Sequence, residues 1–212
     1  MTQRSRAGSY PWWPVAMTLL LLSDASPIAA AERADWFLQA RWGVMTHYLG
    51  APPSSDGGAE LTSEMWNRQI DAFDVAGLAD QIASTGVDYF GMTMYQNSGW
   101  FNAPTAPYDE VTGYRAGERC CPRDIPMEMA DALARRGIKF FVYVTGQVPN
   151  RDKKAQAAYG LEVGPKDQVI TPQFARKWAE VFRHWSERYG RKVFGWWVDG
   201  CYTGCEFNEE IA

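Results

Sequence analysis

The sequence lacks two features that mark common binding classes. Its 21 basic residues do not exceed its 25 acidic residues, so the formal net charge is −4. Proteins that bind nucleic acid carry clustered Lys and Arg to neutralise phosphates, and we therefore expect no nucleic-acid partner. No glycine-rich phosphate fingerprint follows the first predicted strand, which argues against the nucleotide-binding versions of the doubly wound fold.

Long hydrophobic runs are also missing. The apolar run at 15–22 is eight residues long, whereas a helix needs about 20 residues to cross a bilayer. Arg4 and Arg6 precede this run, and small residues that end at Ala31 form an A-x-A cleavage pattern. We therefore predict a signal peptide at 1–31, a secreted or periplasmic protein, and no membrane span after cleavage. An uncleaved anchor is the alternative.

Cysteine is scarce, and its spacing excludes more than it assigns. In an oxidising compartment the four thiols can pair, and we expect one bridge between the first pair and the second pair, about 80 residues apart. A zinc site is disfavoured because C-x-x-C knuckles and a neighbouring His are absent. A redox or metal module therefore remains only as an alternative, and we expect no metal and no cofactor. The candidate disulfide residues are Cys120, Cys121, Cys201 and Cys205.

Apolar material is plentiful by contrast, and it is arranged as a repeating alternation. Hydrophobic residues make up 46% of the chain and aromatic residues 14%, enough for the core of one domain or of part of a larger one. β-rich segments alternate with helical ones that have capping residues at their starts and glycines at their ends. Strands are predicted at 41–48, 87–94, 138–146 and 193–198, and helices at 75–85, 126–137 and 172–189.

The residues that begin and end these helices support the assignment. Asp74 can cap the first predicted helix, and Gly137 can end the second, which has Pro126 in its first turn. Thr171 can cap the third helix. Its apolar stripe has helical spacing and predicts core packing rather than a ligand surface. The stripe consists of Phe174, Trp178, Val181, Phe182 and Trp185.

Four strand–helix steps predict an α/β fold with a parallel sheet and right-handed crossovers. The two candidate architectures are a doubly wound sheet and a (β/α)8 TIM-type barrel, and the missing fingerprint favours the barrel. A complete barrel takes about 250 residues, more than remain after residue 31. We therefore expect only about the first four β/α units.

Polar and aromatic residues gather where the predicted strands end, which is where parallel α/β folds carry their active sites. The first strand ends near His47, the second runs into Tyr95, Gln96 and Asn97, and the fourth ends at Asp199. The third strand ends near Thr145 and Gln147. A shared pocket of these groups would suit a sugar.

Alternation along the fourth strand, "VFGWWV", places Trp197 and Asp199 on one face. An indole could then cover the apolar C–H surface of a sugar while the carboxylate attacks or binds it. Each candidate also has a structural interpretation. Asp199 precedes Gly200 in a common turn dipeptide, His47 could be a hydrogen-bonded structural histidine, and Gln96 with Asn97 could form a turn.

Four segments in order resemble the α-L-fucosidases of glycoside hydrolase family 29. They are "DWFLQARWGVMTHY", "MWNRQIDAFDVAGLADQIASTGVDYFGMT", "RDIPMEMADALARRGIKFFVYV" and "YGRKVFGWWVDG". The similarity covers about residues 35 to 200. It implies that 32–212 is the amino-terminal portion of a fucosidase-like (β/α)8 catalytic domain.

The resemblance also implies roles for single residues. Asp199 matches the aspartate nucleophile of a retaining glycosidase, and His47 matches a histidine that holds the sugar. Where the family has a His-His-Asp-Gly-Phe run, this chain reads "QNSGW" from Gln96 to Trp100, so neutral amides replace the paired histidines. Fucose preference is therefore open.

The family's general acid/base lies beyond the fourth strand, outside this chain, and the chain alone is expected to be inactive. Neither catalytic role needs a metal. The alternative function is a non-catalytic carbohydrate-binding protein on the same scaffold. The candidate substrate-binding residues are His47, Tyr95, Gln96, Asn97, Trp100 and Trp197.

Overall fold

The computed structural model describes residues 34–48, 61–163, 168–169 and 171–200. The chain divides into two compact units, residues 1–38 and 39–212. Residues 34–39 are helical, and all other elements below belong to the second unit. The predicted signal peptide at 1–31 lies outside the described residues and stays a prediction.

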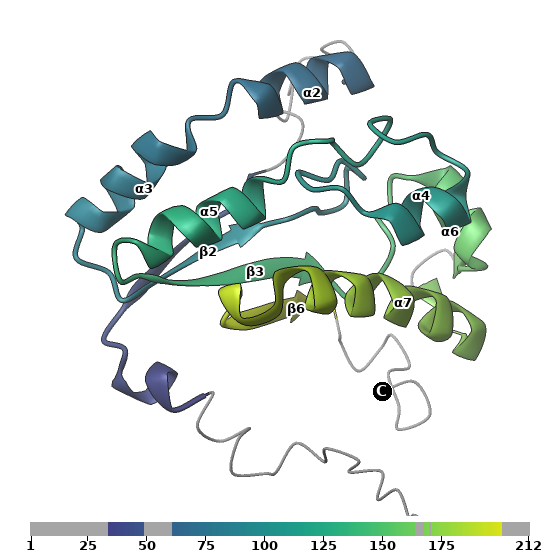
Figure 1. The fold of residues 1–212 in the computed structure, drawn as a ribbon. Helices are drawn as coiled ribbons and strands as arrows, with labels where there is room; N and C mark the ends of the chain where they lie inside the picture. Colours follow the sequence, from purple (N-terminus) through teal and green to yellow (C-terminus); the bar gives the residue numbers. More distant parts are fainter. Residues whose placement is uncertain (1–33, 49–60, 164–167, 170, 201–212) are drawn as a thin grey trace, which may run out of the picture. The chain divides into compact units, whose positions relative to one another are not determined.

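A four-stranded parallel sheet forms the centre of the second unit (Figure 1). Its strands are β1 (Gly43–Thr46), β2 (Tyr89–Thr93), β3 (Lys139–Thr145) and β6 (Gly195–Asp199), in the order β1-β2-β3-β6. The register places Thr145 beside Asp199. The predicted α/β class with a parallel sheet is therefore confirmed. The sheet has four strands within the described residues, and closure into a barrel stays a prediction.

Helices connect the strands. Among the described residues they are α2 (Ser63–Asp71), α3 (Val75–Ser84), α4 (Ala106–Thr112), α5 (Ile125–Ala134), α6 (Lys153–Tyr159), α7 (Pro172–Tyr189) and the 3-10 turn η1 (Gly190–Lys192). A two-stranded antiparallel pair, β4 (Glu162–Val163) and β5 (Gln168–Val169), precedes α7.

The expected capping residues work as the sequence predicts. The Asp74 carboxylate accepts a hydrogen bond from the Gly77 N–H at 2.8 Å, and the Thr171 hydroxyl accepts one from the Phe174 N–H at 3.1 Å. Gly137 adopts φ 72° after α5, a left-handed conformation that glycine reaches without steric cost. These local signals fix where three of the helices begin or end.

Three helices were missed by the sequence predictions, which assign no helix to 63–71 or to the regions of α4 and α6. Thr62 caps α2, and Asp152 caps α6 by accepting from the Ala155 N–H at 3.0 Å. The helices α4 and α6 have only seven residues each. So short a segment carries too little periodicity to be recognised, and packing against neighbours stabilises it instead.

One face of the sheet is covered by helices and contains the core. Phe90, Phe140 and Val142 on this face are at most 1% exposed. The α7 stripe packs against the core as predicted, and the ring of Trp185 stacks on Trp196 of β6 with centroids 6.1 Å apart. The aromatic stripe is therefore core.

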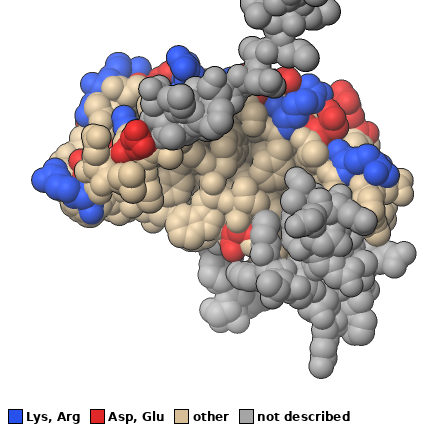
Figure 2. All heavy atoms as spheres, turned by 90° about the horizontal axis from the view of Figure 1, so that it is seen from below, with Lys and Arg blue, Asp and Glu red and all other residues tan. Residues whose placement is uncertain are grey.

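The opposite face, which we call the open face, has no described helix of this unit against it (Figure 1). Phe141, Tyr143 and Trp197 lie on it, and the ring of Trp197 contacts the rings of the other two. Figure 2 shows that uncharged residues dominate the middle of this side. Trp197 is 54% exposed.

Two glycines let aromatic rings lie flat across the open face. A Cβ added to Gly43 would meet the Tyr89 ring at 2.2 Å, and one added to Gly91 would meet the Phe141 ring at 2.3 Å. A side chain at either position would therefore displace a ring of the neighbouring strand. The glycines explain how the open face can be both flat and aromatic.

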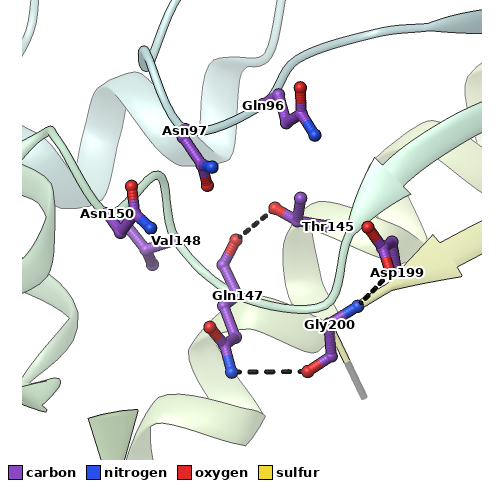
Figure 3. Close-up of a pocket in the computed structure, with 8 residues that line it drawn as sticks. All are labelled: Gln96, Asn97, Thr145, Gln147, Val148, Asn150, Asp199 and Gly200. Atoms are coloured by element: carbon purple, nitrogen blue, oxygen red, sulfur yellow. Dashed lines mark hydrogen bonds between the residues drawn. The ribbon is translucent and has the colours of Figure 1, made fainter. Parts of the chain in front are cut away.

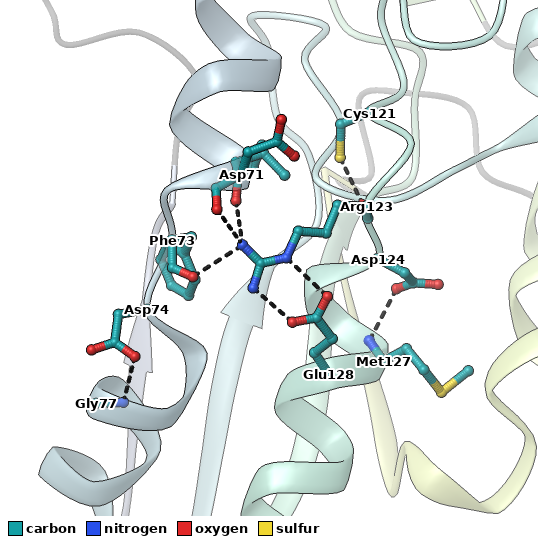
Figure 4. Close-up of polar contacts among 10 residues, drawn as sticks. Asp71, Phe73, Asp74, Gly77, Cys121, Arg123, Asp124, Met127 and Glu128 are labelled. Atoms are coloured by element: carbon teal, nitrogen blue, oxygen red, sulfur yellow. Dashed lines mark hydrogen bonds and ion pairs between the residues drawn. The ribbon is translucent and has the colours of Figure 1, made fainter.

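A single arginine ties two helices of the covering layer together (Figure 4). The Arg123 guanidinium donates to the backbone carbonyls of Ile70, Asp71 and Phe73, at and just beyond the end of α2, at 2.6 to 3.0 Å. Its other nitrogens pair with both carboxylate oxygens of Glu128 in α5, at 2.9 and 2.7 Å. The planar guanidinium suits this combined geometry, which lysine cannot reproduce.

No helix among the described residues is both long enough and apolar enough to cross a bilayer.

Candidate functional site

A pocket of about 270 Å³ opens at the carboxyl ends of β2, β3 and β6 (Figure 3). Its position matches the general rule for ligand sites in parallel α/β folds. The pocket brings together three of the predicted site residues, Gln96, Asn97 and Asp199. The complete lining is Gln96, Asn97, Thr145, Gln147, Val148, Asn150, Asp199 and Gly200.

Asp199 makes the turn contact that the sequence allowed, and it also lines the pocket. Its Oδ1 accepts a hydrogen bond from the Gly200 N–H at 2.8 Å, which is the expected turn contact. Its Oδ2 accepts a hydrogen bond from the Tyr143 hydroxyl. The backbone is fixed as well, because the Gly146 N–H donates to the Asp199 carbonyl at 2.6 Å. Within the described residues, Tyr143 and Gly200 therefore hold the carboxylate at the pocket.

The sequence predictions missed Val148 and Asn150 of the lining, and they also missed Tyr143, which contacts Asp199. Tyr143 is 3% exposed, and its hydroxyl also accepts a hydrogen bond from the Gln96 Nε2 at 3.2 Å. Alternation along β3 places Tyr143 on the same face as Thr145. Thr145 was already recognised at the end of the third strand, so the same period-two argument would have found Tyr143.

His47 joins this group through Tyr143 rather than through the pocket lining. The two rings meet edge to face, with centroids 4.9 Å apart. The imidazole Nδ1 lies 3.1 Å from the Thr93 hydroxyl, and the side chain is exposed. Tyr143 therefore contacts both the imidazole that ends the first strand and the carboxylate that ends the fourth.

Neutral amides form most of the polar surface of the pocket. Gln96, Asn97, Gln147 and Asn150 line it, and Asp199 is the one carboxylate among the lining residues that the structure describes. The Gln147 Nε2 lies 3.4 Å from the Gly200 carbonyl. Amides donate and accept hydrogen bonds without charge, which suits the hydroxyl groups of a neutral sugar.

Tyr95 supports the pocket from below instead of lining it. Its side chain is 1% exposed, and its hydroxyl donates to the carbonyls of Thr145 and Gln147, the latter at 3.1 Å. Burial raises the pKa of this hydroxyl. The structure thus gives Tyr95 a structural position and not the expected sugar contact.

The two candidate tryptophans, Trp100 and Trp197, differ in how far their side chains are exposed. Trp100 is 8% exposed and lies between Trp66 and Arg119, whose guanidinium carbon is 4.3 Å from the ring centroid. Its faces are therefore occupied by protein groups. Trp197 is the accessible one, because it lies on the open face two residues before Asp199 with its indole half exposed.

The first cysteine pair does not take part in the expected disulfide. Cys120 and Cys121 carry free thiols and are both buried. Cys201 and Cys205 lie outside the described residues. Burial, together with the nearby Asp124, raises the pKa of Cys121 to about 12. A thiol acts as a nucleophile or metal ligand only when deprotonated, so this pair does not favour the redox alternative.

Within the described residues, no group of three or more His, Cys, Asp or Glu side chains is arranged to hold a metal ion.

Comparison with known proteins gives a structural likeness. The chain matches no protein-family model, and no curated protein matches its sequence. A bacterial fucosidase solved with a monovalent iminocyclitol inhibitor is similar to it with a TM-score of 0.52 and 18% identity over 79% of this chain. An α-L-fucosidase isoenzyme 1 from Paenibacillus thiaminolyticus is similar with a TM-score of 0.52 and 19% identity over 81% of this chain.

These matches show that the chain shares the fold of part of the fucosidase structures. It spans 41% and 44% of the length of those two chains. The structural match supports a shared fold, and at this low sequence identity it does not establish a shared activity.

Proposed function

We propose that the protein is a retaining glycoside hydrolase of the α-L-fucosidase type, in which Asp199 is the nucleophile. The observation that carries the proposal is the position of the Asp199 carboxylate. It lies at the carboxyl end of β6, lines a pocket of neutral amides, and receives a hydrogen bond from Tyr143. The fold shared with two fucosidases adds support.

In this mechanism an Asp199 oxygen forms a bond to the anomeric carbon while the bond to the leaving oxygen breaks. A carboxylic acid about 5 Å from the nucleophile would protonate that oxygen. As a carboxylate it would later take a proton from a water molecule, whose oxygen bonds to the anomeric carbon while the bond to Asp199 breaks. The described part of the pocket offers no second carboxyl group. We therefore propose that the acid/base comes from elsewhere in the whole protein, as would the strands that close a (β/α)8 barrel.

Other parts of the proposal concern the substrate and its compartment. The substrate would be a carbohydrate, with Gln96, Asn97 and Trp197 in contact with it and His47 beside it. Export to the periplasm or the medium would follow from the signal peptide proposed at 1–31.

One observation favours a second candidate, a carbohydrate-binding protein without catalysis. Gln96 and Asn97 stand where the resembled family has paired histidines. Amides at these positions retain hydrogen bonding, so binding could persist in the absence of turnover.

A covalent labelling experiment separates the two candidates. In 2-fluoro-fucosyl fluoride, fluoride leaves with the bonding electron pair and needs no protonation, so an adduct can form without the acid/base. We expect mass spectrometry of the full-length protein to find one sugar on the peptide that contains Asp199. 2-Fluoro-galactosyl fluoride is tested in parallel because fucose preference is open.

The matched variants are Asp199→Asn, which should form no adduct, and Asp71→Asn at an exposed site, which should label as the unchanged protein does. Sugar binding with no adduct from either fluoride would support the carbohydrate-binding protein. An adduct on a residue other than Asp199 would overturn the assignment of the nucleophile.

A further inference from the structure

We propose that Gln96 is a positioning residue that acts on Asp199 through Tyr143. The inference rests on the proposed function, because it concerns the same carboxylate. It arises from two consecutive hydrogen bonds, from Gln96 Nε2 to the Tyr143 hydroxyl and from that hydroxyl to Asp199 Oδ2 (Figure 3 shows Gln96 and Asp199).

The direction of the two hydrogen bonds is fixed by chemistry. An ionised carboxylate can only accept, so the Tyr143 hydroxyl must give its single proton to Asp199. The hydroxyl oxygen then has only lone pairs to offer, and the amide nitrogen of Gln96 can only donate to it. Each group is therefore in the role that favours an ionised, oriented Asp199.

The first two members of this chain of contacts, Gln96 and Tyr143, are fixed by their surroundings. Gln96 is part of a turn in which its carbonyl accepts from the Gly99 N–H at 3.1 Å, and Gly99 has φ 78°. Tyr143 stands on the central strand β3, and the edge-to-face contact with His47 limits its ring from another side. The hydroxyl is consequently held in one place, where Gln96 donates a hydrogen bond to it.

The inference also gives a physical meaning to Gln96, which stands where the resembled family has a histidine. Glutamine keeps an N–H donor at this position without a group that titrates near neutral pH. A histidine here could also donate, so Gln96→His is the conservative variant. Gln96→Leu removes the donor at similar size, and Gln96→Glu replaces it by an acceptor that competes for the Tyr143 proton.

The test combines a spectroscopic measurement with the labelling rate, both on the full-length protein. Carbon-13 NMR follows the Tyr143 Cζ and Asp199 Cγ resonances, which are identified by their absence in Tyr143→Phe and Asp199→Asn. We expect both resonances to shift in Gln96→Leu and in Gln96→Glu. In Gln96→His they should return toward the values of the unchanged protein. Gln81→Leu, at an exposed position of α3, is the matched control and should shift neither.

The rate of labelling by 2-fluoro-fucosyl fluoride should fall about fivefold in Gln96→Leu, the loss expected for one neutral hydrogen bond. The fall should be larger in Gln96→Glu, and Gln96→His should recover the rate. Unchanged Asp199 Cγ and Tyr143 Cζ resonances in Gln96→Leu would overturn the inference. If the unchanged protein forms no adduct, the proposed function fails, and the NMR result alone decides whether Gln96 positions Asp199.

Discussion

The two faces of the sheet are built from similar residues and do different things. On the covered face, aromatic side chains such as Trp185 and Phe140 are buried to 1% exposure or less. On the open face, Trp197 is half exposed, although it belongs to the same sheet. Aromatic content alone therefore does not distinguish a core residue from a candidate sugar platform.

Polar groups make the difference between the faces clearer. The open face includes Tyr143, which contacts both His47 and Asp199 near the pocket. The polar groups of the covering layer instead join helices to each other, as Arg123 joins α2 to α5. The covered layer therefore contains most of the buried contacts of the described residues, while the open face leaves Trp197 accessible.

The largest expected effect is on the covered face. Trp185→Ala should lower the free energy of unfolding by about 3 to 5 kcal/mol, because it leaves a cavity beneath α7. Trp197→Ala should cost less than about 1 kcal/mol, since the indole is already half in water. Urea unfolding followed by circular dichroism measures both. Equal losses for the two variants would mean that the open face is part of the core.

A smaller effect is expected from the arginine contact. Arg123→Met should cost about 2 kcal/mol, because it removes donors from backbone carbonyls and leaves Glu128 without its bidentate partner. Arg123→Lys should lose part of that free energy, since an ammonium cannot serve both groups at once. The same unfolding experiment applies. The control is Arg183→Met, which removes an exposed ion pair on α7. If Arg123→Met lowers the free energy of unfolding no more than this control does, the α2–α5 contact contributes little.

Local signals made the sheet and the longer helices predictable from sequence. Asp74 and Thr171 are strong caps, and Gly137 ends a helix at a positive φ. The short helices α4 and α6 also carry end signals, such as the Asp152 cap of α6, but seven residues show too little periodicity to be recognised. Tertiary contacts such as the hydrogen bond from Tyr108 to Asp152 at 2.7 Å help to hold them. Such contacts join residues 44 positions apart and leave no local pattern.

The candidate site was predictable only in part for a related reason. The rule that strands end at the site found Gln96, Asn97 and Asp199, which do line one pocket. The rule says nothing about side-chain direction after a strand ends, and Tyr95 and Trp100 turned out to be buried. Within a strand the direction does follow from alternation, which is why Tyr143 was within reach of the same sequence.

An effect that depends on pH is expected for a carboxylate in the covering layer, Asp109 of α4. Burial, with repulsion from Glu118, raises its pKa to about 6, although a hydrogen bond from Cys120 opposes the shift. An unfolded aspartate has a pKa of about 3.9, so the folded protein binds this proton more tightly. The contribution to stability is therefore full below about pH 4 and is lost as the pH rises toward about 6.

Asp109→Asn should remove this dependence, because an amide does not ionise. The difference in unfolding free energy between Asp109→Asn and the unchanged protein should move in favour of the variant from pH 4 to pH 6 and then stay constant. Urea unfolding at half-unit steps of pH measures it. Parallel curves for the two proteins would show that the helix layer tolerates the Asp109 charge as well as water does. The contrast between a layer that disfavours a carboxylate and a face that holds one at Asp199 would then be weaker than the structure indicates.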